Sequence, residues 1–158
     1  MIFLTVGTQL HFDRLVRAVD EALSERPELK VFGQIAQGNY RPKHMEFSPF
    51  LSPREFEQHF NNATHVIGHA GMGTIIQSLL HQKPVLIMPR RASLGEQRND
   101  HQLATARRFC DRAGVLVAAD ERGLASQLDN LAHLTSSQPI GEFATPPLLN
   151  FVAKFIAS

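Results

Sequence analysis

His69-Ala70-Gly71-Met72-Gly73-Thr74 is the stretch that decides the fold, because it is a glycine-rich turn between two apolar segments. Residues 64–68 before it predict a buried strand, and residues 75–80 after it predict a helix. Glycine has no Cβ, so the backbone of such a turn can approach a ligand closely. The unpaired N–H groups and the positive end of the helix dipole favour an anionic group such as phosphate. A tight strand-to-helix turn without a ligand is the alternative interpretation.

Strand-like and helix-like segments alternate on both sides of this turn. The apolar residues of 12–23 share one helical face, and its charged residues, Asp20 among them, fall mostly on the other. Ser52 and Glu55 have the spacing of a capping box. Asn99 or Asp100 can cap a helix that reaches about Arg112, with Gly114 at its C′ position.

The patterns together predict the following elements. The expected strands span residues 2–6, 29–36, 45–47, 64–68, 85–88 and 115–117. The expected helices span residues 12–23, a short segment after 52, a segment from the glycine turn to 81, about 99–112 and 121–131. A last helix is expected at the carboxyl end, and its apolar residues are Leu148, Phe151, Val152, Phe155 and Ile156.

This alternation is typical of a parallel sheet with helices on both faces. We therefore predict a single α/β domain over residues 1–158, with a Rossmann-like doubly wound parallel sheet. Ligands of such sheets bind beyond the carboxyl ends of the strands. Three polar loops follow strand ends, and we expect them to converge on one site: residues 7–9, 69–74 and 89–101.

Composition narrows the class of protein. The chain has 158 residues, 43% of them hydrophobic, which suffices for one domain with its own core. A formal net charge of +1 argues against a polyanion-binding protein, so we expect no nucleic-acid partner. The eight histidines lack metal-ligand spacing, and we expect no metal. The single cysteine, Cys110, fits a reducing cytosol, and we expect neither a signal peptide nor a membrane-crossing segment.

Several candidate site residues also have a purely structural interpretation. His69 can brace the loop or act on a ligand, and Thr74 can cap the following helix or contact a phosphate. The polar residues that follow the turn, and those that follow the strand ending at Pro89, have three alternative roles: exposure to solvent, capping of a helix, or binding of a ligand. They are Gln77, Arg90, Arg91, Arg98, Asn99, Asp100, His101 and Gln102.

Four motifs in this order resemble glycosyltransferase family 28, in its C-terminal, nucleotide-sugar-binding half. They are Val6-Gly7-Thr8-Gln9, the turn at 69–74, Lys83-Pro84-Val85-Leu86-Ile87-Met88-Pro89 and Asn99-Asp100-His101-Gln102. The resemblance covers residues 1 to about 117. Two kinds of member are most similar: the small cytosolic catalytic subunit of the dolichol-linked N-acetylglucosamine transferase, and its bacterial counterparts in capsule and exopolysaccharide synthesis. The resemblance implies the donor-binding half of a GT-B glycosyltransferase.

The resemblance also implies a role for each motif in binding a UDP-sugar. Gly7-Thr8-Gln9 match a first glycine loop that faces the diphosphate, and Ala70 to Thr74 match a second at the helix N-terminus. Phe50-Leu51 fall near the segment that holds uracil. Asn99-Asp100-His101-Gln102 match the segment that faces the donor sugar and the phosphates. Gln77 stands where the family usually has a glutamate bound to the ribose hydroxyls, and an amide is the weaker acceptor.

The implied function is the catalytic subunit of an inverting hexosyltransferase in cell-surface polysaccharide synthesis. It transfers a hexose or N-acetylhexosamine from a UDP-sugar to a lipid-linked saccharide, without a cofactor. Backbone N–H groups, Thr74 and Arg90 or Arg91 would stabilise the leaving diphosphate. His69 and His11 are minority candidates for the catalytic base.

The resemblance further implies a second protein. We expect the chain to begin directly at its first strand, without an acceptor domain before Met1. A membrane-anchored partner subunit is therefore expected to supply the acceptor site and the base, which places this chain in the cytoplasm, peripheral to the inner face of the membrane. We expect the isolated chain to be inactive, and self-association of the isolated chain is one expected state.

Two other functions fit the same residues. One is a non-catalytic nucleotide-sugar-binding enhancer of a partner glycosyltransferase. The other is a different α/β nucleotide binder, which would prefer a nucleotide other than UDP. The expected terminal helix either packs on the core of its own chain or contacts the partner.

Overall fold

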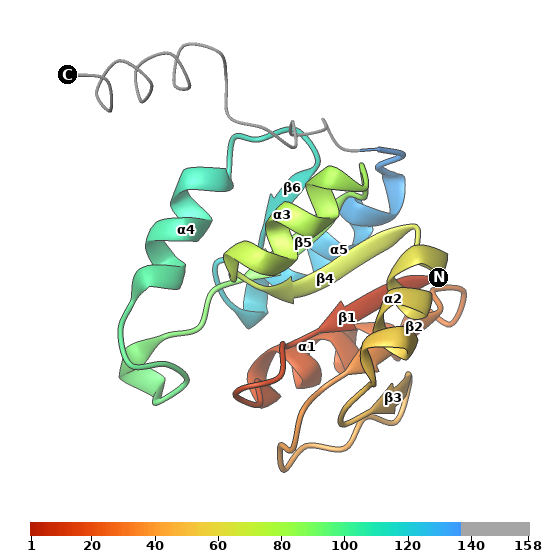
Figure 1. Cartoon of the computed structure of the whole chain (residues 1–158), viewed down its shortest axis with the longest axis horizontal. Helices are drawn as coiled ribbons and strands as arrows, with labels where there is room; N and C mark the ends of the chain where they lie inside the picture. Colours follow the sequence, from red (N-terminus) through yellow and green to blue (C-terminus); the bar gives the residue numbers. More distant parts are fainter. Residues whose placement is uncertain (137–158) are drawn as a thin grey trace, which may run out of the picture.

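Six strands form one parallel sheet in the computed structural model of the chain, which describes residues 1–136 (Figure 1). The sheet order is β3-β2-β1-β4-β5-β6, so the chain winds outward from β1 in one direction and then from β4 in the other. This order is that of the doubly wound dinucleotide-binding folds, and the predicted fold is confirmed. The strands are β1 (Ile2–Thr5), β2 (Val31–Gln34), β3 (Glu46–Ser48), β4 (His65–His69), β5 (Val85–Met88) and β6 (Val115–Val117).

Helices cover both faces of this sheet (Figure 1). Side chains alternate across each parallel strand, so Leu4 packs with α1 and α5 on one face while Phe3 packs with α2 and α3 on the other. Both faces are therefore buried, as expected for a parallel sheet. The helices are α1 (Asp13–Leu23), α2 (Pro53–Asn62), α3 (Met72–Leu80), α4 (His101–Phe109) and α5 (Leu124–His133), with short 3₁₀ turns η1 (Ala92–Leu94) and η2 (Glu121–Gly123).

Local sequence signals predicted the ends of most helices and strands to within a few residues. The capping box at the start of α2 is present: the Ser52 hydroxyl accepts from the Glu55 N–H at 3.3 Å, and the Glu55 carboxylate accepts from the Ser52 N–H at 2.8 Å. The prediction of Gly114 at the C′ position of α4 is wrong, because α4 ends at Phe109. Gly114 instead has a φ of 85° in the turn before β6. The expected terminal helix lies outside the described residues.

The predicted polar face of α1 needs a correction at Asp20. Its carboxylate is buried and accepts hydrogen bonds from the Tyr40 hydroxyl at 2.8 Å and from the backbone N–H groups of Lys43 and His44. Burial raises the pKa of Asp20, but these hydrogen bonds outweigh it and lower the pKa below its ordinary value. Asp20 therefore fastens the loop between β2 and β3 to α1. Among the described helices, none is long and apolar enough to cross a membrane.

Candidate functional site

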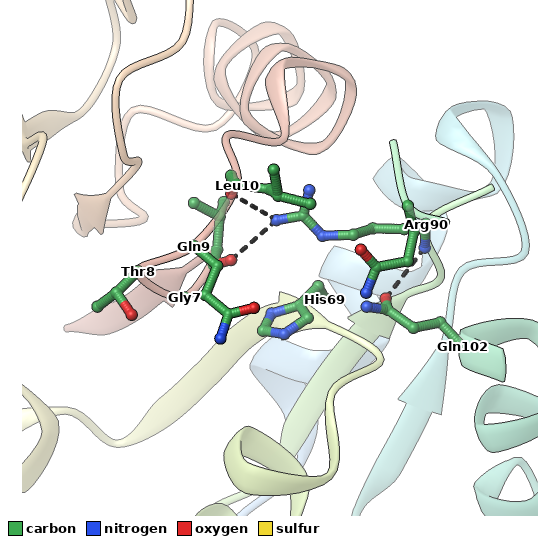
Figure 2. Close-up of a pocket in the computed structure, with 9 residues that line it drawn as sticks. Gly7, Thr8, Gln9, Leu10, His69, Arg90 and Gln102 are labelled. Carbon is green, nitrogen blue, oxygen red and sulfur yellow. Dashed lines mark hydrogen bonds between the residues drawn. The ribbon is translucent and has the colours of Figure 1, made fainter. Parts of the chain in front are cut away.

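A cavity of about 270 Å³ opens at the carboxyl edge of the sheet, where the winding direction changes between β1 and β4 (Figure 2). This is the switch point at which doubly wound sheets bind ligands. The loops after β1 and β5 meet there with His69, the last residue of β4, and with the first turn of α4. The predicted convergence is thus confirmed for residues 7–9, His69, Arg90 and Gln97, whereas residues 70–74 do not line the cavity. The lining residues are Val6, Gly7, Thr8, Gln9, Leu10, His69, Arg90, Gln97 and Gln102.

Arg90, which follows β5, braces the first loop of the cavity. Its side chain is buried, and one terminal nitrogen donates to the carbonyls of Val6 at 2.9 Å and Leu10 at 2.7 Å. The other donates to the carbonyl of His11 at 2.6 Å and, more weakly, to that of Glu96 at 3.4 Å. Figure 2 shows the guanidinium reaching across to Leu10. The terminal nitrogens are therefore occupied by backbone, and a direct phosphate contact of Arg90 stays a prediction.

Glu96 ties the loop after β5 to the rest of the domain. Its carboxylate accepts two hydrogen bonds from Arg14 of α1, at 2.7 and 2.8 Å, and one from the N–H of Arg91 at 2.9 Å. Bidentate pairs of arginine and carboxylate fix geometry well. Arg14 also donates to the Pro89 carbonyl and to Glu121. These hydrogen bonds therefore fix the loop that carries Gln97 both at its start, at Pro89, and next to Gln97, at Glu96.

His69 ends β4, and its ring lies between the two glycine loops. A Cβ on Gly71 would stand 2.3 Å from Nε2 of His69, and a Cβ on Gly7 would stand 3.2 Å from its Cε1. Gly7 also has a φ of 80°, which side chains disfavour. A side chain at either position would therefore press on the imidazole, and at position 71 the ring or the helix would have to shift. The packing of His69 thus favours glycine at both positions.

The protonation of His69 follows from its surroundings. Burial, together with the positive charge of Arg90, lowers the pKa of His69 to about 4. The ring is therefore neutral at pH 7, and its buried Nδ1 has no hydrogen-bond partner within residues 1–136. A neutral imidazole can donate to or accept from a ligand, but with this pKa it is a weak base.

The N-terminus of α3 lies beside His69 and offers unpaired donors. Gly71 is the N-cap and supplies no capping side chain, so the predicted cap at Thr74 is wrong, because the helix already begins at Met72. The first intrahelical bond runs from the Ile75 N–H to the Gly71 carbonyl at 3.2 Å. The N–H groups of Met72, Gly73 and Thr74 precede that bond and lack intrahelical acceptors.

Gln102 is the polar side chain that α4 places in the cavity. It is buried, and its carboxamide oxygen accepts from the Arg90 N–H at 3.1 Å. Its amide nitrogen has no hydrogen-bond partner in the described part of the chain and faces the cavity (Figure 2). The contact with Arg90 fixes the orientation of the amide, so that a donor is left for a ligand.

Two further hollows adjoin the cavity and contain other predicted residues. One, of about 360 Å³, lies between α2 and α3. It shares Thr8 with the cavity and is lined by Leu51 and Gln77. The other, of about 620 Å³, shares Gln9, Leu10 and Gln97 with the cavity. Its remaining lining residues are Gly95, Arg98, Asn99 and His101.

Other predicted residues lie near the site without lining these hollows. Ala70 is buried in the core, and Phe50 is exposed on the loop before α2. Arg91 donates to the Ala119 carbonyl at 3.1 Å, and Asp100 accepts from the Ala92 N–H at 2.8 Å. His11 is exposed and lies 3.5 Å from Asp13. Their roles in donor binding stay predictions.

Sequence reasoning missed Gln97, Leu10 and Val6 as lining residues. Gln97 borders both the cavity and the hollow beside α4, yet it sits in a loop without a recognisable motif. Its position after β5 was the one available signal. Among the described residues, no group of three His, Cys, Asp or Glu side chains is arranged to hold a metal ion.

Comparison with known proteins identifies a family. The Glycosyltransferase family 28 C-terminal domain matches residues 1–140. None of the curated proteins matches the chain. In fold it is similar to the glycotransferase of kitacinnamycin, with a TM-score of 0.62 and 17% identity over 84% of this chain and 35% of that one. This similarity confirms the expected fold, a doubly wound α/β domain of the kind found in GT-B glycosyltransferases.

A second solved structure overlaps almost the whole chain, with lower similarity. The glycosyltransferase SnogD from Streptomyces nogalater has a TM-score of 0.45 and 15% identity over 99% of this chain and 43% of that one. The chain thus spans less than half the length of both solved structures.

Proposed function

The chain belongs to the glycosyltransferase family 28 C-terminal domains, and from this we propose that it binds a UDP-sugar as the catalytic subunit of an inverting hexosyltransferase. A hexose or N-acetylhexosamine would pass to a lipid-linked saccharide in cell-surface polysaccharide synthesis. A membrane-anchored partner subunit would bind that acceptor. In this proposal the chain acts in the cytoplasm, at the inner face of the membrane, and needs no cofactor.

The observation that supports donor binding most strongly is the glycine at position 73. Gly73 is the second residue of α3, and a Cβ placed on it would meet nothing within 4 Å. A glycine inside a helix costs about 0.5 to 1 kcal/mol relative to alanine. The fold of this chain therefore gains nothing from glycine there. A ligand that approaches the helix N-terminus closely would explain it.

The chemistry of this surface suits a diphosphate. The N–H groups of Met72, Gly73 and Thr74 and the positive end of α3 would bind its oxygens. The amide nitrogen of Gln102 would add a donor from the opposite side of the cavity. As the bond to the sugar breaks, charge grows on the leaving UDP, and donors fixed in advance stabilise that charge.

The catalytic base is proposed to come from the partner. No carboxylate is among the residues that line the cavity, and His69 with a pKa of about 4 is a weak base at pH 7. His11 lies outside the cavity. The lack of a strong base in the cavity also fits the second candidate function, a non-catalytic enhancer that presents the donor to a complete partner transferase.

Replacing Gly73 by alanine is expected to separate folding from donor binding. The free energy of unfolding should rise by up to about 1 kcal/mol, because alanine is the better helix former and its Cβ meets open space. Affinity for the UDP-sugar should fall at least about tenfold, because the Cβ stands over the phosphate-binding N–H groups. Denaturant unfolding and titration calorimetry measure the two effects.

Reconstitution with the partner tests the proposed function itself. Transfer from a UDP-sugar to a lipid-linked acceptor is measured with the partner alone, with the wild-type chain added, and with the Gly73→Ala and Gln102→Ala chains added. A catalytic subunit predicts no transfer by the partner alone and greatly reduced transfer with either variant. Transfer by the partner alone that the chain only increases would favour the enhancer. Equal transfer with wild type and both variants would contradict donor binding at this site.

A further inference from the structure

The groove between α2 and α3 has the shape and composition of a nucleoside subsite. Its upper part is apolar, with Leu51, Pro53 and Phe56, and it joins the cavity at Thr8. His81, at the end of α3, also lines the groove, and its ring contacts that of Phe60 edge to face, with 5.4 Å between the ring centroids. A ligand whose diphosphate lies in the cavity could therefore extend its other end past Thr8 into this partly apolar groove.

One carboxylate faces this groove, on α2. Among the described residues that line the cavity and its two neighbouring hollows, Glu57 is the single acidic side chain. The side chain of Glu57 makes no hydrogen bond or ion pair within residues 1–136. In contrast, the neighbouring Glu55 is engaged in the capping box of α2. Glu57 is thus available to a ligand, whereas Glu55 is not.

Glu57 and Gln77 line the groove from its two sides, on α2 and α3. Both helices begin at the carboxyl edge of the sheet, α2 at Pro53 and α3 at Met72. With a rise of 1.5 Å per residue, Glu57 lies about 6 Å from the start of its helix and Gln77 about 7.5 Å from the start of its own. A ligand group at that depth is flanked by a carboxylate on one side and a carboxamide on the other.

We propose that the carboxylate of Glu57 binds the vicinal hydroxyls of the ribose of a ribonucleotide in this groove, opposite Gln77. A carboxylate accepts from two hydroxyls at once with the help of its charge, whereas the amide of Gln77 accepts through one oxygen. The carboxylate that α3 lacks at position 77 is thereby supplied from α2. This inference rests on the proposed function, because the diphosphate of the same ligand occupies the cavity.

Calorimetric binding of UDP and 2′-deoxy-UDP tests this assignment. The wild-type chain is expected to bind UDP about tenfold more tightly than 2′-deoxy-UDP, the loss expected for one charge-assisted hydrogen bond. Glu57→Gln should weaken UDP binding at least about tenfold and 2′-deoxy-UDP binding by less, because the deoxy compound contacts the carboxylate through its 3′-hydroxyl alone, so the discrimination is reduced. Glu28→Gln, on an exposed loop away from the groove, is the matched control and should behave as wild type.

The outcomes separate this inference from the proposed function. Tight UDP binding with unchanged discrimination in Glu57→Gln would overturn the role of Glu57 and leave the donor site in place. Absence of UDP binding by the wild-type chain would overturn the proposed function and the ribose assignment together. Restored discrimination in the double variant Glu57→Gln with Gln77→Glu would support the assignment, because the carboxylate then faces the same ribose from α3.

Discussion

Replacing Arg90 by methionine is expected to lower the free energy of unfolding by about 3 kcal/mol, the largest effect on stability that we predict for a single side chain. Methionine fills much of the same volume but donates no hydrogen bond. The carbonyls of Val6, Leu10 and His11 would lose their donor, and unsatisfied buried acceptors cost about 1 to 3 kcal/mol each. Three such acceptors would cost about 3 to 9 kcal/mol together, and access of water to the exposed residues Leu10 and His11 keeps the total near the lower end.

The same substitution should loosen the first wall of the cavity. The loop after β1 carries Gly7, Thr8 and Gln9, and Arg90 is its main fastening to β5. Denaturant unfolding and hydrogen exchange of residues 7–11 measure the two consequences. Arg91→Met is the matched control, because its guanidinium donates to one carbonyl, that of Ala119, and it should cost less than about 1 kcal/mol. A stability of Arg90→Met within about 0.5 kcal/mol of wild type would refute the bracing role.

Gly71→Ala is expected to have the largest effect on ligand binding. The backbone of Gly71 has a φ of −89°, which alanine adopts without strain, so the effect is purely steric. The new Cβ would stand 2.3 Å from Nε2 of His69, and on the other side the ring is limited by Gly7. Either the imidazole moves into the cavity or the first turn of α3 is displaced. Stability should fall by about 2 kcal/mol and UDP affinity by about 100-fold.

A double variant isolates the cause. Removing the ring with His69→Ala in the Gly71→Ala background should recover most of the lost stability, because the clash has gone. Gly73→Ala, two residues further on, is the contrasting control, since its Cβ has space and stability should rise instead. If Gly71→Ala binds UDP as well as the wild type does, the placement of His69 between the two glycine loops has no functional consequence.

Much of the fold could be predicted because its signals are local. The strand at 85–88 is a short apolar run, half of it β-branched, that stops at a proline. The start of α2 is marked by a proline and a capping box. The glycine turn at 69–74 predicted the strand-to-helix junction at the centre of the sheet. The burial of Asp20 could not be predicted, because its partners lie 20 to 24 residues away in a loop whose course depends on the tertiary structure.

The sequence predicted which loops form the candidate site, but it did not predict which side chains contact one another there. The order of the strands brings 7–10, 69 and 102 to one edge, which follows from the fold class alone. The occupation of Arg90 by backbone carbonyls could not be inferred, because an arginine after a strand looks the same whether it faces a phosphate or a loop. Gln97 and Glu57 could not be predicted for a similar reason. Neither residue stands in a motif, and tertiary packing alone brings each one to the site.

The central claim is that the cavity and the adjoining groove together bind a uridine diphosphate, and calorimetric titration of the chain with UDP, uridine, ADP and GDP tests it most directly. UDP is expected to bind at least about tenfold more tightly than each of the others, because uridine lacks the diphosphate for α3 and the segment at Phe50-Leu51 is proposed to hold uracil. Uridine binding as tightly as UDP, or equal or tighter binding of ADP or GDP, would contradict it.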